Sequence, residues 1–173
     1  MNIKTIMPGD FLAASQFLFD AEFAKSVVLI TGTDGRGYSG IKINHVLQGR
    51  NTPSGAIAYS GGPVAKRTGN IIHTPDVTWE KTRHITAELC ITNIDKNTVD
   101  LEREQMPQSY FLAFGFATWI KGQLEEEIMN GFWLPVNTGN EIIFSIPAVD
   151  RWYAAHRSAS IYPECVSGDS GRC

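Results

Sequence analysis

Residues 115–135, GFATWIKGQLEEEIMNGFWLP, constrain the fold of this chain more than any other segment. The apolar start predicts the end of a buried strand, and the acidic middle predicts a short helix. Asn130 and Gly131 supply a helix stop, because glycine readily takes the left-handed conformation that ends many helices. The segment 132–135 then returns to a strand. Strands and a helix in so short a segment indicate an α/β domain built around a sheet.

The predicted helix has one apolar side with two acidic residues at its margins. At about 100° per residue, a stripe is formed by three apolar residues at intervals of four, Ile120, Leu124 and Ile128. Glu125 and Glu127 lie about 80° to either side of this stripe, and Glu126 points away from it. The two marginal carboxylates are therefore expected at the boundary between core and water, within reach of backbone N–H groups or a cation.

The composition is that of an ordinary globular protein. The 173 residues fit one domain, expected over 1–157, followed by a flexible tail of small residues over 158–173. A hydrophobic content of 43% and a charged content of 19% argue against disorder. The net charge is −3 and the Lys and Arg residues are scattered, so the basic footprint of a nucleic-acid binder is missing. We expect no direct contact with nucleic acid.

The ends of the chain and its cysteines bear on its location. No apolar run is long enough to span a membrane. Pro8, Gly9 and Asp10 stand where a signal peptide would need an apolar core, so a cytoplasmic location is expected. Three cysteines, an odd number, do not make a disulfide framework. Cys90 is expected on a buried strand, and the thiols at 165 and 173 are expected to be incidental.

Several further elements are expected along the chain. The predicted strands are 11–15, 26–31, 41–44, 56–60, 70–73, 88–94, 110–117 and 142–146. Helical segments are expected at 21–25, capped by Asp20, and at 98–106 and 151–157, with a loop at 48–54. Four consecutive apolar residues in 26–31 predict a strand covered on both faces, whereas alternation in 41–44 predicts a half-buried one. The segment 110–117 is the most apolar and is predicted to be central.

The glycine-rich segment 32–40 contains a literal match to the dinucleotide-binding fingerprint, with glycines at 35, 37 and 40. The phosphate-binding version of this motif opens a helix, whose free N–H groups hold the anion. Here the motif leads into an alternating strand, and no acidic residue follows about 20 positions later. A long hairpin turn is the favoured interpretation.

The motifs of residues 115–134 resemble the signature GYxGW…GQLExEI…WL of the YqgE/AlgH family. The matching segments are 115–119, GQLEEEI at 122–128 and WL at 133–134. Supporting matches follow the family's order at 9–12, 23–28, 40–44, GGPV at 61–64 and 72–73, so the resemblance covers about residues 8–157. Three features depart from it: a short loop after His45 and Val46 replaces a proline and a helical insertion, Thr118 stands at a usually small position, and the tail has no counterpart.

The resemblance implies a bacterial, cytosolic α/β protein with a strongly coiled, mixed or antiparallel sheet flanked by a few short helices. It implies no particular reaction. Some members carry the label of transcriptional regulator, but this sequence has no helix-turn-helix, zinc motif or basic stripe.

Our first functional hypothesis is a non-enzymatic binding or regulatory module, a monomer or weak homo-oligomer that binds an unidentified protein. Its surface would be the GQLEEE helix and the GGPV turn, with the candidate residues Gly61, Gly62, Pro63, His73, Trp119, Gln123, Glu125 and Glu127. Trp119 and Trp133 flank the helix and are expected mainly to pack in the core, although aromatic anchors also suit an interface.

The alternative hypothesis is a small enzyme acting on a small metabolite. His73 would form an acid–base pair with Glu125 or Glu127, because an imidazole beside a carboxylate holds a proton near neutral pH. The competing interpretation of His73 is a side chain that hydrogen-bonds the backbone to fix a turn. The four histidines, His45, His73, His84 and His156, lack metal-ligand spacing, and no cofactor is expected. The sequence has no Gly-x-Ser-x-Gly elbow, and Ser26, Ser39 and Ser60 show no local sign of activation.

Overall fold

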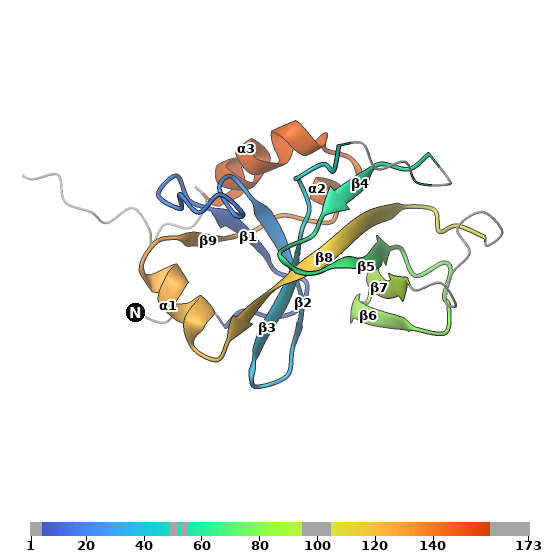
Figure 1. Ribbon diagram of the computed structural model, residues 1–173, viewed down its shortest axis with the longest axis horizontal. Helices are drawn as coiled ribbons and strands as arrows, with labels where there is room; N and C mark the ends of the chain where they lie inside the picture. The colour runs from blue at the N-terminus through green and yellow to red at the C-terminus, as the bar shows by residue number, and fades with distance from the viewer. Residues whose placement is uncertain (1–4, 49–51, 53–54, 95–104, 160–173) are drawn as a thin grey trace, which may run out of the picture.

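The computed structural model describes residues 5–48, 52, 55–94 and 105–159. These residues form a curled sheet around the long strand β8 (Figure 1). In chain order the strands are β1 (Phe11–Ala14), β2 (Val27–Thr33), β3 (Gly37–Lys42), β4 (Ala58–Ser60), β5 (Val64–His73), β6 (Thr82–Thr86), β7 (Leu89–Ile94), β8 (Tyr110–Ile120) and β9 (Trp133–Val136).

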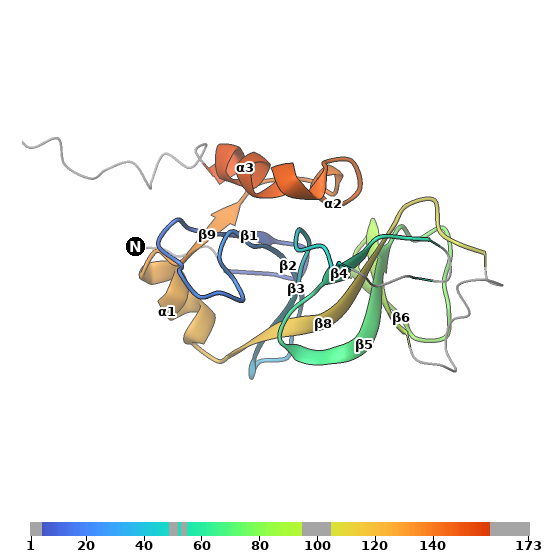
Figure 2. The same ribbon diagram turned by 45° about the horizontal axis from the view of Figure 1, so that its top comes forward.

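The strand order is β6-β7-β5-β8-β3-β2-β1-β9, with β4 paired to β8. Only the β4–β8 pair is parallel among the named strand pairs. β8 joins the two halves of the sheet, because it pairs with β5 up to Phe116 and with β3 from Ala117 onward. The predicted central place of this strand and the predicted coiled, mainly antiparallel sheet are confirmed (Figure 2).

Three helices accompany the sheet in the described part of the chain: α1 (Gln123–Met129), α2 (Glu141–Phe144) and α3 (Ala148–Ala159). α3 packs over β1, β2 and β9, and α2 lies beside it, whereas α1 lies at the far end of β8 (Figures 1 and 2). None of the helices in the described ranges is both long and apolar enough to cross a membrane.

The core lies on both faces of β2, as its run of apolar residues predicts. Val27 and Leu29 belong to the cluster beneath α2 and α3, and Val28 and Ile30 belong to the cluster that includes α1. Successive side chains of a strand point to opposite faces, so four consecutive apolar residues fill both clusters. β2 is therefore buried on both sides.

α1 ends as the sequence predicts. Gly131 has a φ of 73°, and its N–H donates to the Ile128 carbonyl at 3.0 Å. The N–H of Phe132 donates to the Glu127 carbonyl at 2.9 Å. Together these two bonds form a Schellman motif, which satisfies carbonyl groups at the end of the helix.

The predicted apolar stripe of α1 is wrong at its first member. Ile120 is the last residue of β8, and its side chain is 74% exposed. The helix begins only at Gln123, because Gly122 with a φ of 83° turns the chain between strand and helix. Leu124 is fully buried and Ile128 packs partly against the same cluster, so the remaining two members of the stripe do face the core.

The predicted strand 142–146 is also wrong, because this segment forms α2. The N–H groups of Ser145 and Ile146 both donate to the Glu141 carbonyl, which closes a helical turn. Ile142 and Ile143 are buried against α3 and the sheet. A short apolar run fits a buried strand or a buried helical turn equally well, so its sequence alone does not separate them.

Other boundaries differ less. The glycine-rich segment 32–40 is the hairpin between β2 and β3, as favoured. β6 was not predicted, and β5 begins six residues before the predicted 70–73. α3 extends through 158 and 159, the first residues of the expected tail. The rest of the tail and most of the predicted helix 98–106 and loop 48–54 lie outside the described residues.

Candidate functional site

The carboxylate of Glu127 fastens α1 to two strands. Trp119 donates its Nε1–H to Glu127 Oε2 at 2.8 Å, and Trp133 donates its Nε1–H to the same oxygen at 2.9 Å. Gln123 donates from Nε2 to Glu127 Oε1 at 2.9 Å. Both oxygens therefore accept bonds from neutral donors within the protein, and Glu127 anchors the helix. Trp119 and Trp133 are 4% and 2% exposed, so both indoles pack in the core as expected.

Glu125 lies on the opposite margin of α1, as predicted, and pairs with β3. Tyr38 donates its hydroxyl to Glu125 Oε1 at 2.9 Å. The other oxygen, Oε2, is buried and is the one such side-chain atom without a hydrogen-bond partner within the described ranges. Burial, followed by this hydrogen bond, raises the pKa of Tyr38. Glu126 is exposed, in agreement with its predicted outward direction.

The GGPV turn is pressed against the middle of β8. Gly61 and Gly62 are buried, whereas Pro63 and Val64 are exposed. A Cβ atom added to Gly62, which has a φ of 153°, would lie 2.2 Å from the carbonyl carbon of Phe116. The two glycines thus permit a backbone approach that a side chain would block. Only the second half of the turn is available to another molecule.

Residues 21–25 form a turn between the helix and the GGPV segment. Asp20 Oδ1 accepts hydrogen bonds from the N–H groups of Glu22 at 2.9 Å and Phe23 at 3.2 Å, so the predicted cap is confirmed. The ring of Phe23 lies 6.3 Å from the ring of Trp119 and 5.7 Å from that of Trp133. The turn therefore packs directly on the two indoles that hold Glu127.

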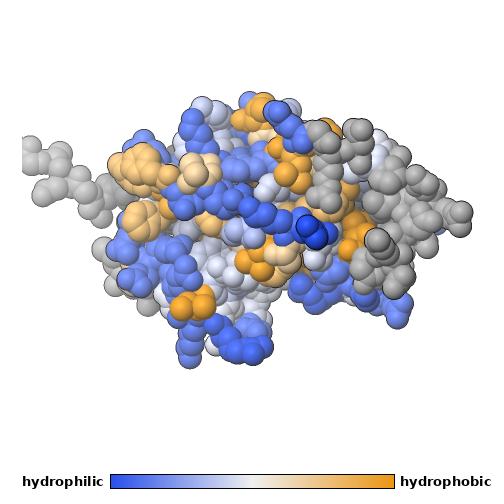
Figure 3. All heavy atoms as spheres, viewed as in Figure 1, coloured by the Kyte–Doolittle hydropathy of each residue, from blue (hydrophilic) through white to orange (hydrophobic). Residues whose placement is uncertain are grey.

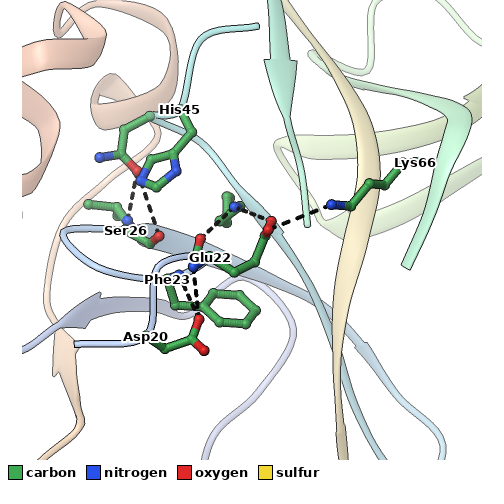
Figure 4. Close-up of polar contacts among 9 residues, drawn as sticks. Asp20, Glu22, Phe23, Ser26, His45 and Lys66 are labelled. Atoms are coloured by element: carbon green, nitrogen blue, oxygen red, sulfur yellow. Dashed lines mark hydrogen bonds and ion pairs between the residues drawn. The ribbon is translucent and has the colours of Figure 1, made fainter. Parts of the chain in front are cut away.

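A buried lysine of β3 binds to the same turn. Lys42 is 1% exposed, although the alternating pattern of 41–44 predicts that it faces water. Its Nζ donates to the Glu22 carboxylate and to the Glu22 carbonyl, each at 2.7 Å. Lys66 approaches the other carboxylate oxygen at 3.7 Å (Figure 4). The expectation is wrong because Glu22, twenty residues away in the chain, supplies a partner inside the protein.

The ion pair between Lys42 and Glu22 connects the GQLEEE helix with the GGPV turn, the two segments of the surface expected from the sequence. The backbone N–H of Lys42 donates to the Gly61 carbonyl at 2.8 Å, while Phe23, next to Glu22, contacts the indoles beneath α1. The hydrogen bond from Lys42 is the main cause that lowers the pKa of Glu22. Sequence reasoning missed Glu22, Lys42 and Lys66, and no local pattern marks them.

A serine and a histidine meet beside this ion pair. Ser26 Oγ lies 3.2 Å from His45 Nε2 (Figure 4). Ser26 is fully buried, so a substrate has no access to its hydroxyl. Burial, and secondly the charge of Lys42, lower the pKa of His45. The pair therefore joins the residue before β2 to the segment after β3.

His73 lies away from both glutamates. It pairs with Tyr110 at the start of β8, whereas Glu125 and Glu127 follow the end of this 11-residue strand. His73 is 0% exposed, with Nδ1 2.8 Å from the Thr74 carbonyl and Nε2 2.9 Å from Thr92 Oγ1. Burial lowers its pKa. The structure does not bring the proposed acid–base pair together, and the backbone-bonding interpretation of His73 is confirmed.

No group of three or more His, Cys, Asp or Glu side chains within the described ranges is arranged to hold a metal ion. Cys90 is buried on β7, as expected, with its Sγ 3.5 Å from His84 Nδ1. Burial raises the pKa of its thiol.

Four large apolar side chains around the C-terminal end of α1 are exposed, and we call them the α1 patch: Phe17 (61%), Phe19 (82%), Met129 (66%) and Phe132 (36%). The loop after β1 and the end of α1 are neighbours, because Ser15 N–H donates to the Phe132 carbonyl at 2.9 Å. Figure 3 shows hydrophobic groups over the region where Figure 1 places α1 and this loop. Single exposed apolar residues are common, but a cluster of large ones on one surface suggests a contact site.

A family model described as AlgH-like matches residues 11–164, which is most of the chain. The chain belongs to the AlgH-like family. A UPF0301 protein of Saccharophagus degradans is 32% identical to it over 174 residues, with 93% of this chain and 86% of the relative covered. A UPF0301 protein of Mannheimia succiniciproducens is 30% identical over 179 residues, covering 94% and 96%. The family resemblance of the sequence is thereby confirmed, and these relatives are bacterial.

Two solved structures share the fold of this AlgH-like chain. The solution structure of AlgH from Pseudomonas aeruginosa has a TM-score of 0.73 at 21% identity and covers 100% of this chain and 99% of its own. The crystal structure of DIP2367 from Corynebacterium diphtheriae has a TM-score of 0.72 at 21% identity and covers 91% and 89%. The curled sheet with few short helices is thus shared with these two structures.

Proposed function

We propose that this chain is a non-enzymatic, cytoplasmic protein-binding module with a regulatory role. Its docking surface is the α1 patch, continued along the exposed side of α1 to Glu126 and, beyond the 21–25 turn, to Pro63 of the GGPV turn. The single observation that carries the proposal is the exposure of Phe17 and Phe19 in the loop after β1 and of Met129 at the end of α1, two segments joined by the hydrogen bond from Ser15 to Phe132. Large apolar side chains in contact with water favour association with another protein.

The surface is well supported from beneath. Glu127 holds α1 through Trp119 and Trp133, and Phe23 packs on both indoles. A surface that is ordered before binding loses less conformational entropy when a partner docks. This rigid support favours the candidate residues Trp119, Gln123 and Glu127 as positioning residues for the patch rather than as contact residues.

The charge around the patch indicates the chemistry of the partner. α1 carries Glu125 and Glu126 in its first turn and no basic residue in its last turn. A partner that presents apolar side chains together with a Lys or Arg facing Glu126 would match both features. The complementary charge would act mainly on the rate of association, and the apolar contacts on the lifetime of the complex.

The test uses a variant that removes exposed apolar groups without touching the core. Tagged wild-type chain is used to capture proteins from a bacterial extract, and the captured protein is purified and titrated by calorimetry. In the Phe19→Ser/Met129→Ser variant we expect the Kd to rise at least about tenfold, since each lost anchor costs on the order of 1 kcal/mol or more.

The matched control is Val149→Ser/Tyr153→Ser, because these α3 residues are 80% and 55% exposed but lie outside the patch. It is expected to bind like the wild type. Equal weakening by both variants, or no weakening by the patch variant, would contradict the proposed surface.

A further inference from the structure

A cleft between α2, β4 and the start of β8 contains a buried positive charge. Arg151 of α3 lines this cleft of about 270 Å³ and is only 5% exposed. Other cavities of about 430 and 560 Å³ exist in the described parts of the chain, but the arginines of the first are exposed and the second has no Lys or Arg in its lining. The cleft at Arg151 is therefore distinguished by its chemistry and not by its size.

The guanidinium of Arg151 donates hydrogen bonds to three uncharged backbone carbonyl groups. Nε donates to the Ile146 carbonyl at 2.9 Å, Nη2 donates to the Ile143 carbonyl at 2.7 Å, and Nη1 donates to the Ile43 carbonyl. These bonds tie α2 and α3 to the sheet. They satisfy N–H groups, but carbonyl dipoles do not cancel a full charge taken out of water.

Two aromatic rings complete the surroundings of the charge. The guanidinium carbon lies 5.2 Å from the ring of Tyr59 and 5.5 Å from that of Phe111. Burial is the largest influence on the Arg151 pKa and lowers it, whereas Tyr59 acts in the opposite direction. No Asp or Glu of the described ranges forms an ion pair with Arg151. The cleft therefore holds a cation whose counter-charge does not come from these residues.

We propose that this cleft binds a small organic carboxylate with an apolar, ring-sized body, whose carboxylate supplies the counter-charge for Arg151. Guanidinium groups match carboxylates in shape and hydrogen-bond direction. The remaining lining is largely apolar, with Tyr110, Ile143 and Phe144 beside the two rings. The volume lies just below the range of about 300–1,000 Å³ typical of ligand pockets, which favours a one-ring ligand over a dinucleotide.

This inference goes beyond the proposed protein-binding function, since the α1 patch and the cleft involve different residues. Either proposal fails or stands without the other. The probes are benzoate, its uncharged analogue benzamide, and acetate, which has the charge without the ring. Binding is followed by NMR titration of the intact chain up to about 10 mM ligand, including the Arg151 Nε–H signal.

We expect benzoate to shift the Arg151 signal and neighbouring cleft signals saturably, and benzamide and acetate to bind at least about tenfold more weakly. Ile57 lines the cleft and is 60% exposed, so Ile57→Trp fills the cleft without disturbing the core. This variant should lose benzoate binding. Ile120→Trp, at a residue 74% exposed elsewhere, is the control and should retain it.

Absence of a saturable benzoate response would overturn the proposal. Equal binding of benzamide, or a response that survives Ile57→Trp, would also overturn it. Because the test leaves Arg151 in place, its outcome does not depend on whether substitution of this arginine permits folding.

Discussion

The ammonium group of Lys42, almost completely buried, lies 2.7 Å from the carboxylate of Glu22. A charge in this position is tolerated because the turn at residues 21–25 closes over it and supplies a carboxylate and a carbonyl. Removal of one member of such a pair leaves the other charge buried without compensation. The ion pair is consequently expected to contribute to the free energy of unfolding, to make that free energy depend on pH, and to support the surface at α1.

Glu22→Gln is expected to lower the free energy of unfolding at pH 7 by about 1–3 kcal/mol, below the 3–5 kcal/mol of fully buried pairs because Glu22 is partly exposed. Urea denaturation measures this change. Glu126→Gln, an exposed change on α1 with the same loss of charge, should stay within about 0.5 kcal/mol of wild type. Equal effects of the two substitutions would show that the buried pair is unimportant.

The stabilisation from Glu22 should vanish in acid. Its folded-state pKa lies below the ordinary 4.5, so the unfolded chain takes up protons first as the pH falls. The contribution is complete above pH 4.5 and is lost as the pH falls through the lowered folded-state pKa. Wild type and Glu22→Gln should therefore converge in stability under acid conditions. A difference in free energy of unfolding between the two proteins that stays constant until Glu22 is fully protonated would contradict the stabilising role of the Glu22 carboxylate.

Glu127→Ala should destabilise the protein more than any other glutamate substitution in α1. Two buried indole N–H groups lose a charged acceptor, at a cost of about 2–4 kcal/mol. Chemical denaturation gives the magnitude, and near-ultraviolet circular dichroism reports the altered packing of Trp119 and Trp133. Glu126→Ala is the control. Unchanged tryptophan signals in a folded Glu127→Ala protein would contradict the anchoring role.

Gly62→Ala should cost about 3 kcal/mol or more, because the added Cβ meets the β8 backbone as well as a strained φ. Gly122 also has a positive φ, but open space surrounds its Cβ position. Gly122→Ala should therefore cost only about 1–2 kcal/mol. Thermal and urea unfolding of both variants separate the steric contribution from the conformational one. Similar losses in the two variants would rule out the close approach as the cause.

His73 should make stability depend on pH in the range below neutrality. Burial lowers its folded-state pKa below 6.5, so the unfolded chain protonates first and stability falls as the pH drops from 6.5 toward the folded value. His73→Gln should flatten this dependence in part, since His45 contributes in the same direction. Urea unfolding between neutral and mildly acidic pH measures the slope, with His84→Gln as an exposed control. An unchanged slope in His73→Gln would refute the prediction.

Local features of the sequence predicted local features of the fold. The end of α1 at Gly131 and the two buried faces of β2 follow from residues adjacent in the chain, so both could be predicted. The run at 142–146 could not be assigned correctly, because four apolar residues fit a buried strand or a buried turn of helix. The contacts of α2 with α3 and β8 belong to the tertiary fold, which the local sequence does not reveal.

The candidate site was harder to predict, because its contacts span long distances in sequence. The helical periodicity predicted that Glu127 lies at a margin of α1. It did not predict the two indoles that donate hydrogen bonds to this carboxylate. Burial of Lys42 depends on Glu22, and neither residue carries a local mark of this pairing. The hypothesis that His73 meets Glu125 or Glu127 needed the strand order, which places them at opposite ends of β8.

The pairing of β1 with β9 has a consequence for synthesis of the chain. Leu12 lies opposite Pro135, so one neighbour of the first strand is made only when most of the polypeptide has left the ribosome. Until then β1 has an open hydrogen-bonding edge, the kind of surface on which chains associate wrongly. Truncation before residue 133 should therefore yield aggregates and not a smaller folded unit.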